Sequence, residues 1–254
     1  MWRCAALRSP VRTTDLRTSC DRKVRMYPSH RNSFGCLPGP VAEGGTCPGC
    51  TCGEGGCWMA AKKGGITKVC YVDKLARVWK EVRGLLGANT AKLKKACPGK
   101  KYDLFRTMFE KFDADCRAYM HRNPGTDVRY FRLYWSGDVM DMDTALALRR
   151  AIREFTHIRF WLYTRSFGVV RTLAGIRNLR LFVSLDAVNC KEGMRRFWGL
   201  SQRGKLSMAY MGTENPYGFV ACPVDSDMQA LEEACSRCRL CLPGSVANVW
   251  FRTK

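Results

Sequence analysis

The amino-acid sequence predicts an α/β fold with mainly parallel strands and a cysteine-rich loop at each end of the domain. Between residues 128 and 222, apolar runs of strand length alternate with segments of helical period, which is typical of parallel strands joined by right-handed crossovers. The chain has 254 residues, 46% of them hydrophobic, so a single domain can bury a substantial core. No apolar run approaches the roughly 20 residues of a membrane helix, and we expect no membrane association.

Residues 1–33 are predicted to be a disordered basic arm. They carry eight lysines and arginines, with Asp15 and Asp21 as the acidic residues, and they show no hydrophobic periodicity. The segment lacks the apolar stretch of a secretory signal, but its composition is compatible with an organelle transit peptide. A third alternative is a chain that starts at Met26.

Residues 34–70 are expected to form a long functional loop, because glycine, proline and cysteine dominate this segment. Apolar side chains at helical spacing then predict a helix over 73–86 and a second over 103–121, which Asn123-Pro124-Gly125 ends. The pattern beyond residue 128 predicts strands over 128–135, 158–163, 179–185, 206–211 and 219–222, and helices over 142–155, 169–176 and 193–200.

Polar side chains fall where the apolar strands stop. These residues are Asp138, Thr164, Arg165, Asp186 and Cys222. In barrels and open α/β sheets, ligands bind at the carboxyl ends of the strands. We therefore expect a functional site on this rim of the sheet.

The first group of cysteines lies in the glycine-rich loop and comprises Cys47, Cys50, Cys52, Cys57 and Cys70. The chain has 15 cysteines, an odd number, and no secretion signal, so reduced cysteines that bind metal are favoured over a disulfide framework. Glycine lets the backbone bend tightly, which allows thiolates to converge on one ion or cluster. Iron–sulfur clusters and zinc both use such ligands.

The second group of cysteines comprises Cys222, Cys235, Cys238 and Cys241. Two consecutive gaps of two residues resemble the spacing of bacterial ferredoxins, and the fourth cysteine completes a Cys4 set. Zinc can use the same set. Because both groups offer sulfur ligands alone, an iron–sulfur centre is favoured and zinc is the alternative metal.

The charge of the chain points to a polyanionic partner. Lysine and arginine number 43 against 22 acidic residues, which gives a net charge of +21. Such a surplus favours nucleic acid or a nucleotide as the binding partner.

Several short motifs of the chain resemble, in their sequence and in their order along residues 34–241, those of a phage protein family known as gene product eighty-eight. The resembling residues are Leu37-Pro38-Gly39, Gly45-Thr46-Cys47-Pro48-Gly49, Cys70-Tyr71, Phe131-Arg132 with Ser136-Gly137-Asp138, Phe160 with Tyr163-Thr164-Arg165-Ser166, and Cys222-Pro223 with Cys235, Cys238 and Cys241. That family resembles, in outline, the radical S-adenosylmethionine (SAM) enzymes. A phage origin would place the protein in the cytoplasm of the infected bacterial host.

The resemblance to radical SAM enzymes implies a partial (β/α) barrel over residues 34–221 and a C-terminal Cys4 metal-binding segment over 222–254. Three cysteines of the first group would bind a [4Fe–4S] cluster that leaves one iron position for SAM, and Cys50, Cys57 and Cys70 are the candidates. Ser136-Gly137-Asp138 stands where these enzymes hold the SAM amino group. Arg165 and Asp186 would face the substrate, and the second group of cysteines would bind an auxiliary cluster.

The cysteine spacing departs from that of radical SAM enzymes, in which the gaps are three and two residues. Here the gaps are irregular, and twelve residues separate Cys57 from Cys70. An enzyme that modifies a nucleotide or nucleic acid is therefore weighed against a zinc-binding, non-enzymatic module that binds nucleic acid through its phosphates. A zinc-containing base-exchange enzyme, with Asp138 or Asp186 as nucleophile, is a third alternative.

Overall fold

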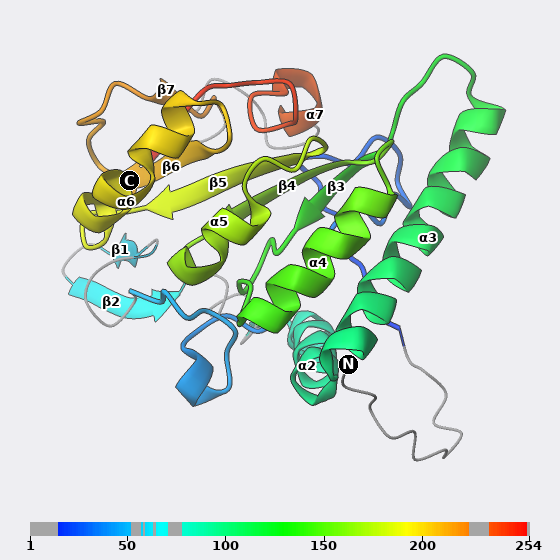
Figure 1. The fold of residues 1–254 in the computed structure, drawn as a ribbon, viewed down its shortest axis with the longest axis horizontal. Helices are drawn as coiled ribbons and strands as arrows, with labels where there is room; N and C mark the ends of the chain where they lie inside the picture. The colour runs from blue at the N-terminus through cyan, green and yellow to red at the C-terminus, as the bar shows by residue number, and fades with distance from the viewer. Residues whose placement is uncertain are drawn as a thin grey trace.

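A sheet of six parallel strands forms the centre of the protein, in the order β3-β4-β5-β6-β8-β7 (Figure 1). The computed structural model describes residues 15–51, 57, 59–62, 65–70, 78–223 and 234–252. The strands are β3 (Tyr130–Leu133), β4 (Arg159–Thr164), β5 (Leu179–Leu185), β6 (Ser207–Gly212), β7 (Val220–Ala221) and β8 (Val249–Arg252). Because β3 and β7 do not pair with each other, the sheet stays open. The predicted α/β fold with mainly parallel strands is confirmed.

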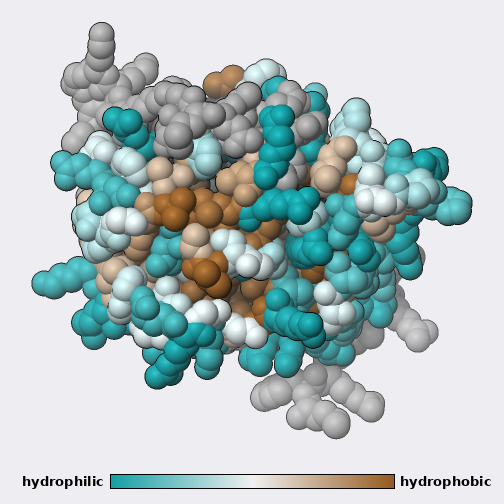
Figure 2. Space-filling view, turned by 90° about the horizontal axis from the view of Figure 1, so that it is seen from above, coloured by the Kyte–Doolittle hydropathy of each residue, from teal (hydrophilic) through white to brown (hydrophobic). Residues whose placement is uncertain are grey.

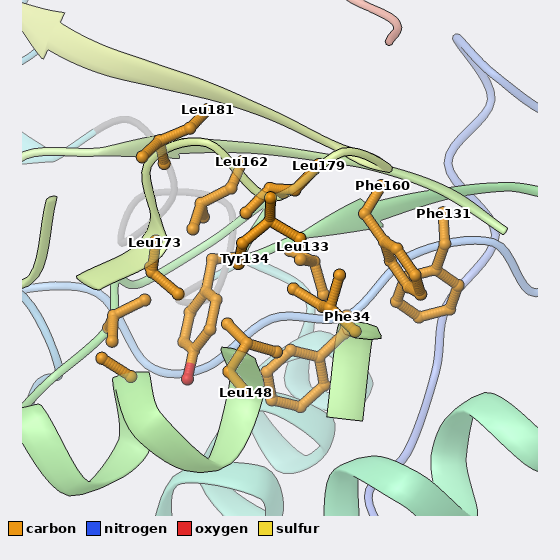
Figure 3. Packing of buried hydrophobic residues seen from close by; sticks show 14 of the residues in the cluster. Phe34, Phe131, Leu133, Tyr134, Leu148, Phe160, Leu162, Leu173, Leu179 and Leu181 are labelled. Carbon is orange, nitrogen blue, oxygen red and sulfur yellow. The ribbon is translucent and has the colours of Figure 1, made fainter. Parts of the chain in front are cut away.

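Helices α3 to α6 cover one face of the sheet, as Figures 1 and 3 show. The helical elements are η1 (Val41–Glu43), α2 (Lys80–Lys95), α3 (Pro98–Arg122), α4 (Met142–Glu154), η3 (Phe167–Val169), α5 (Val170–Leu173), α6 (Cys190–Gln202) and α7 (Ala234–Cys238). Side chains alternate along a strand, so Phe160 and Leu162 of β4 face the helical layer, while Trp161 lies on the opposite face. The main core fills the space between the sheet and helices α3 to α6.

The opposite side of the sheet, which we call the second face, is covered by the two ends of the chain. Val24 and Leu242 pack there against Tyr130 and Trp161. A neighbouring cluster joins Phe182, Ala209, Cys222 and Val249. The second face thus receives segments that are far apart in the sequence. Figure 2, which views the molecule from above Figure 1, shows apolar surface bordered by hydrophilic side chains.

The N-terminal segment is ordered from residue 15, so the expectation of a disordered arm is wrong for residues 15–33. Leu16 and Val24 are buried, and Ser19 forms an antiparallel bridge with Ser33. These contacts join residues distant in sequence and leave no periodic pattern, which is why the sequence does not reveal them. Residues 1–14 of the predicted arm lie outside the described residues.

The segment after Ser33 extends the sheet beyond β3. The Phe34 N–H donates to the Arg132 carbonyl at 3.0 Å, and the Arg132 N–H donates to the Asn32 carbonyl at 2.8 Å. The Cys36 N–H continues this pairing by donating to the Ser136 carbonyl at 2.9 Å. Residues 32–36 therefore run parallel to β3 and lead directly into the glycine-rich loop.

The helix predicted over 73–86 is confirmed over 80–86, and α2 continues from there to Lys95. Residues 73–77 of the prediction lie outside the described residues. Trp79, which the helical pattern places on the apolar face, is exposed, whereas Asn89 is buried. The Asn89 side chain donates to the carbonyls of Arg17 and Gly35, both at 2.9 Å. Because polar residues such as Asn89 share the buried face of α2 with leucines, hydrophobic periodicity does not reveal this part of the helix.

Strand β8, which the sequence analysis missed, inserts between β6 and β7. The segment 222–254, predicted to bind metal, also contributes to the sheet, because its end at Val249–Arg252 pairs with both neighbouring strands. The described helices include none that is long and apolar enough to cross a membrane.

Candidate functional site

A tight glycine turn after β3 begins the candidate site. Gly137 has φ +72°, and a Cβ atom there would lie 2.3 Å from Thr46 Oγ1 and 3.0 Å from the Cys36 carbonyl oxygen. Glycine suits both the left-handed conformation and this close approach. The Asp138 N–H donates to Thr46 Oγ1 at 3.1 Å, and the Ser136 hydroxyl donates to the Cys36 carbonyl at 2.8 Å. The turn after β3 and the loop that carries the first cysteines are therefore locked together.

The buried carboxylate of Asp138 ties the end of β3 to the end of β4. It accepts hydrogen bonds from the Thr164 hydroxyl at 2.6 Å and from the Arg165 N–H at 2.7 Å. Burial raises the pKa of Asp138, and the hydrogen bonds from Thr164 and from the Arg165 and Val139 N–H groups offset only part of that effect. Asp138 thus lies on the predicted rim, where its carboxylate holds two strand ends in place.

A buried ion pair between Arg165 and Asp186 joins the ends of β4 and β5. Asp186 Oδ2 also accepts hydrogen bonds from the Thr51 hydroxyl at 2.8 Å and from the Cys57 N–H at 2.6 Å. Burial acts to raise the pKa of Asp186, but the Arg165 guanidinium and these donors outweigh it, so the pKa lies below its ordinary value. Asp186 is therefore ionised at neutral pH and attaches the cysteine loop to the sheet.

A β-hairpin explains the irregular spacing of the first cysteine group. Strands β1 (Met59–Lys62) and β2 (Gly65–Cys70) pair antiparallel, with Met59 opposite Cys70. Cys57, two residues before β1, is anchored at Asp186 through its N–H and has φ +55°. The hairpin therefore brings Cys70 back beside Cys57, although twelve residues separate them in the sequence.

The first cysteine group gathers at the carboxyl rim. Asp138, Cys50 and Cys70 lie close enough to Cys47 for negative charge on them to raise the pKa of its thiol. Burial raises the pKa of Cys47, and the Asp138 carboxylate adds to the shift. Cys52 lies outside the described residues. Four of the five predicted cysteines are therefore found on the same edge of the sheet as Asp138, Arg165 and Asp186.

A pocket of about 560 Å³ opens beside this rim. Its lining residues are Pro48, Gly49, Cys50, Thr51, Val139, Met140, Asp141, Met142, Arg165, Ser166, Phe167, Gly168, Val169, Asn189 and Glu192. A Cβ atom at Gly49 would lie 2.2 Å from the Arg165 carbonyl oxygen, so only glycine lets the loop approach β4 this closely. The pocket combines Cys50, Arg165, the acidic residues Asp141 and Glu192 and an apolar wall, which suits a ligand of mixed polarity.

The second cysteine group lies on the second face of the sheet, away from the helical layer. Cys241 packs against both apolar clusters there, and Cys222 belongs to one of them. Cys241 is within electrostatic range of Cys222 and Cys238, and Cys235 is within range of Cys241. Burial raises the pKa of Cys235 to about 12 and that of Cys241 to about 11. These four cysteines therefore share one region of the fold.

The described cysteines of the two groups do not have the geometry of a formed metal centre. Within the part of the chain that the structure describes, no three histidine, cysteine, aspartate or glutamate side chains are arranged to hold a metal ion. The metal-binding role of both groups stays a prediction.

Comparison with known proteins identifies the family. A family model described as Gene product 88 matches residues 17–243. The chain belongs to the Gene product 88 family. It is 30% identical to the Gene 88 proteins of Mycobacterium phage D29, over 259 residues, and of Mycobacterium phage L5, over 257 residues. Both alignments cover 94% of this chain and 98% of the relative. No solved structure matches the chain.

Membership of the Gene product 88 family confirms the predicted relationship to phage proteins. The match begins at residue 17 and so includes most of the ordered N-terminal segment. The similarity to radical SAM enzymes, the iron–sulfur or zinc centres and the nucleic-acid partner stay predictions.

Several residues that build the rim were not among the predicted site residues. The Thr46 hydroxyl accepts a hydrogen bond from the Asp138 N–H in the turn after β3, and the Thr51 hydroxyl donates one to Asp186. The Asn189 side chain accepts from the Asp186 N–H at 2.8 Å and closes the turn that leads into α6. Thr46 and Thr51 adjoin cysteines in the glycine-rich loop, and this adjacency is the signal that could have identified them.

Proposed function

We propose that this Gene product 88 protein is an iron–sulfur enzyme of the radical SAM type that modifies a nucleotide or nucleic acid. The observation that carries the proposal is the gathering of Cys47, Cys50, Cys57 and Cys70 around the buried polar residues at the carboxyl rim. Ligand sites of parallel α/β sheets lie at this edge.

The donor set of the rim fits an iron–sulfur cluster. Its candidate ligands are cysteine sulfurs on a loop whose glycines permit close approach to the sheet, and such clusters are held by cysteine thiolates. When bound, a [4Fe–4S] cluster supplies the electron for the reductive cleavage of SAM. The second cysteine group fits a further metal centre by the same chemistry.

In this proposal the polar residues of the rim hold the cysteine loop in position and balance the charges around it. Asp138 holds the ends of β3 and β4 together, and the Arg165–Asp186 pair holds the cysteine loop against β5. Arg165 and Cys50 reach the pocket, so a molecule bound there lies next to the cysteine loop. The net charge of +21 favours a phosphate-bearing substrate.

Anaerobic purification and reconstitution with iron and sulfide test the proposal. We expect a brown protein with an absorbance band near about 400 nm, as thiolate-bound clusters give, and SAM cleavage under reducing conditions. Cys50→Ser should lose the cleavage activity and the rim cluster. Cys20→Ser, which changes an exposed cysteine outside both groups, should retain both. A colourless protein that holds zinc and leaves SAM intact would overturn the radical SAM proposal.

That colourless outcome would favour a zinc-binding nucleic-acid module. Three arginines on α4, Arg149, Arg150 and Arg153, line a second surface pocket and offer contacts for phosphates. Binding to nucleic acid would then weaken steeply as salt is added, because counterions compete with the arginines. Replacing the three arginines by glutamine should reduce the slope of that salt dependence.

A further inference from the structure

A buried arginine lies at the centre of the second face. Arg180 belongs to β5 and is 7% exposed. In the strand register, Arg132 of β3 pairs with Trp161 of β4, which pairs with Arg180. Paired residues of neighbouring parallel strands share a face, so two arginines flank one tryptophan across three strands. Burying a guanidinium this deeply is costly unless a negative charge lies nearby.

Arg180 has no carboxylate partner among the residues that the structure describes. Its Nη2 donates to the Ala247 carbonyl at 2.9 Å, its guanidinium lies 5.2 Å from the Phe182 ring centroid, and its buried Nε has no hydrogen-bond acceptor. Arg165, the comparable buried arginine at the rim, is paired with Asp186. The positive charge of Arg180 therefore needs another source of compensation.

Arg180 lies over the Phe182 ring, and Tyr163 and Cys241 pack against the same apolar cluster. Burial lowers the pKa of Arg180, and negative charge on Cys241 or Tyr163 would act against that shift. Tyr163 is partly buried on the same face, stacks on Phe182 at 4.7 Å between ring centroids and hydrogen bonds with Cys241. Cys241 is in turn within electrostatic range of Cys222 and Cys238. A thiol is neutral, so this group of cysteines balances Arg180 only when its sulfurs are thiolates.

Metal binding would create these thiolates, because cysteine ligands lose their protons to solvent when they coordinate a metal ion. A divalent ion held by four thiolates keeps a net charge of two negative units. We propose that Arg180 and Tyr163 stabilise an anionic metal–thiolate centre formed by Cys222, Cys235, Cys238 and Cys241. Arg180 supplies the balancing charge, and the Tyr163 hydroxyl donates to the Cys241 sulfur.

This inference rests on the metal binding proposed for the second cysteine group, and it assigns Arg180 as a positioning residue of that centre. Groups around the ligands of a metal typically contribute about 10- to 100-fold to metal affinity. Arg180→Met removes the charge and keeps most of the apolar stem, while Arg180→Lys keeps the charge. We expect Arg180→Met to weaken metal binding about 10- to 100-fold and Arg180→Lys to restore most of the affinity.

The affinity is measured by competition with a chelator, in the full chain carrying Cys47→Ser and Cys50→Ser so that the second group is observed alone. Arg159→Met is the matched control, because Arg159 lies over the Tyr130 ring of the same face but pairs with Asp127 at 3.2 Å. We expect its affinity to equal that of the parent. Circular dichroism of each metal-free variant checks that the chain is folded.

The outcomes separate this inference from the proposed function. If the parent chain binds no metal through the second group, the proposed metal centre fails and the inference fails with it. If the parent binds metal and Arg180→Met binds it equally well, the metal centre stands and the role of Arg180 is refuted. Equal losses in Arg180→Met and Arg180→Lys would also overturn the inference, because the charge would then not be the property that matters.

Discussion

The two buried arginines beside the cysteine groups have opposite electrostatic surroundings. At the rim, Arg165 is paired with Asp186, which also accepts hydrogen bonds from the cysteine loop. On the second face, Arg180 lies next to Cys241 and Tyr163 and has no acidic partner among the described residues. Arg165 is thus balanced by a side chain of the rim, whereas Arg180 is balanced only when the nearby cysteines are ionised.

This difference predicts how each region responds to loss of metal. The hydrogen bonds and the Arg165–Asp186 ion pair of the rim do not require a bound metal ion. The second face places a buried guanidinium beside neutral thiols, because burial raises the pKa of Cys235 to about 12 and that of Cys241 to about 11. We therefore expect the rim to be preformed and the second face to depend on its metal.

The largest effect is expected from breaking the ion pair of the rim. Asp186→Asn leaves Arg165 buried without its partner, and the loss of one member of a buried pair costs about 3–5 kcal/mol of folding free energy. Urea denaturation measures this cost. Asp127→Asn is the control, because Asp127 pairs with Arg129 and Arg159 near the surface, where such pairs contribute at most about 1 kcal/mol. Equal losses of unfolding free energy in the two variants would contradict the conclusion that Asp186 balances the charge of Arg165.

A slightly smaller effect is expected from the glycine turn that locks the rim. Gly137→Ala and Gly175→Ala both place alanine at a positive φ, which costs about 1–2 kcal/mol. Gly175 has open space around its Cβ position, whereas the added Cβ at Gly137 would meet Thr46. Overpacking adds about 1–3 kcal/mol, so Gly137→Ala should be the less stable variant in the same denaturation assay. Similar stabilities of the two variants would show that the loop around Thr46 moves to make room for the added Cβ atom.

The smallest effect at neutral pH is expected from His30, in the segment that reaches the second face. His30 stacks against Tyr27 and Phe112, and burial lowers its pKa from 6.5 to about 4. A histidine with a lowered pKa contributes its full stability above pH 6.5, and that contribution is lost as the pH falls toward 4 because the unfolded chain then binds the extra proton. The difference amounts to roughly 3 kcal/mol at pH 4.

Stability curves between pH 4 and pH 7 test this expectation. His30→Phe keeps an aromatic ring and should flatten the curve in this window. His121→Gln, at the exposed end of α3, should leave the slope unchanged. A wild-type slope that persists in His30→Phe would mean that other groups dominate the acid sensitivity.

The sequence predicted the strand-rich half of the protein well, because its apolar runs are continuous. Strand β5 was placed over its full length at 179–185, and Asp138, Arg165 and Asp186 were placed on one rim because parallel strands end on the same edge. The second half of helix α2 was not predicted, because Asn89 and Thr90 make up half of its buried residues and interrupt the apolar pattern.

The parts that the sequence could not reveal depend on contacts between distant residues. The hairpin β1–β2 brings Cys70 back toward Cys57, and β8 inserts between two earlier strands. Arg180 looks like an ordinary interruption of an apolar strand, and its importance emerges only when Cys241 packs nearby. Spacing along the chain identified the candidate ligands but not the charges around them.

The most direct test of the account is the metal content of the anaerobically purified protein and two double variants. We predict that the wild type carries two centres, that Cys47→Ser with Cys50→Ser removes the rim centre alone, and that Cys235→Ser with Cys241→Ser removes the centre on the second face alone. A wild-type protein without metal, or a double variant of either group that loses all of it, would contradict two independent cysteine sites.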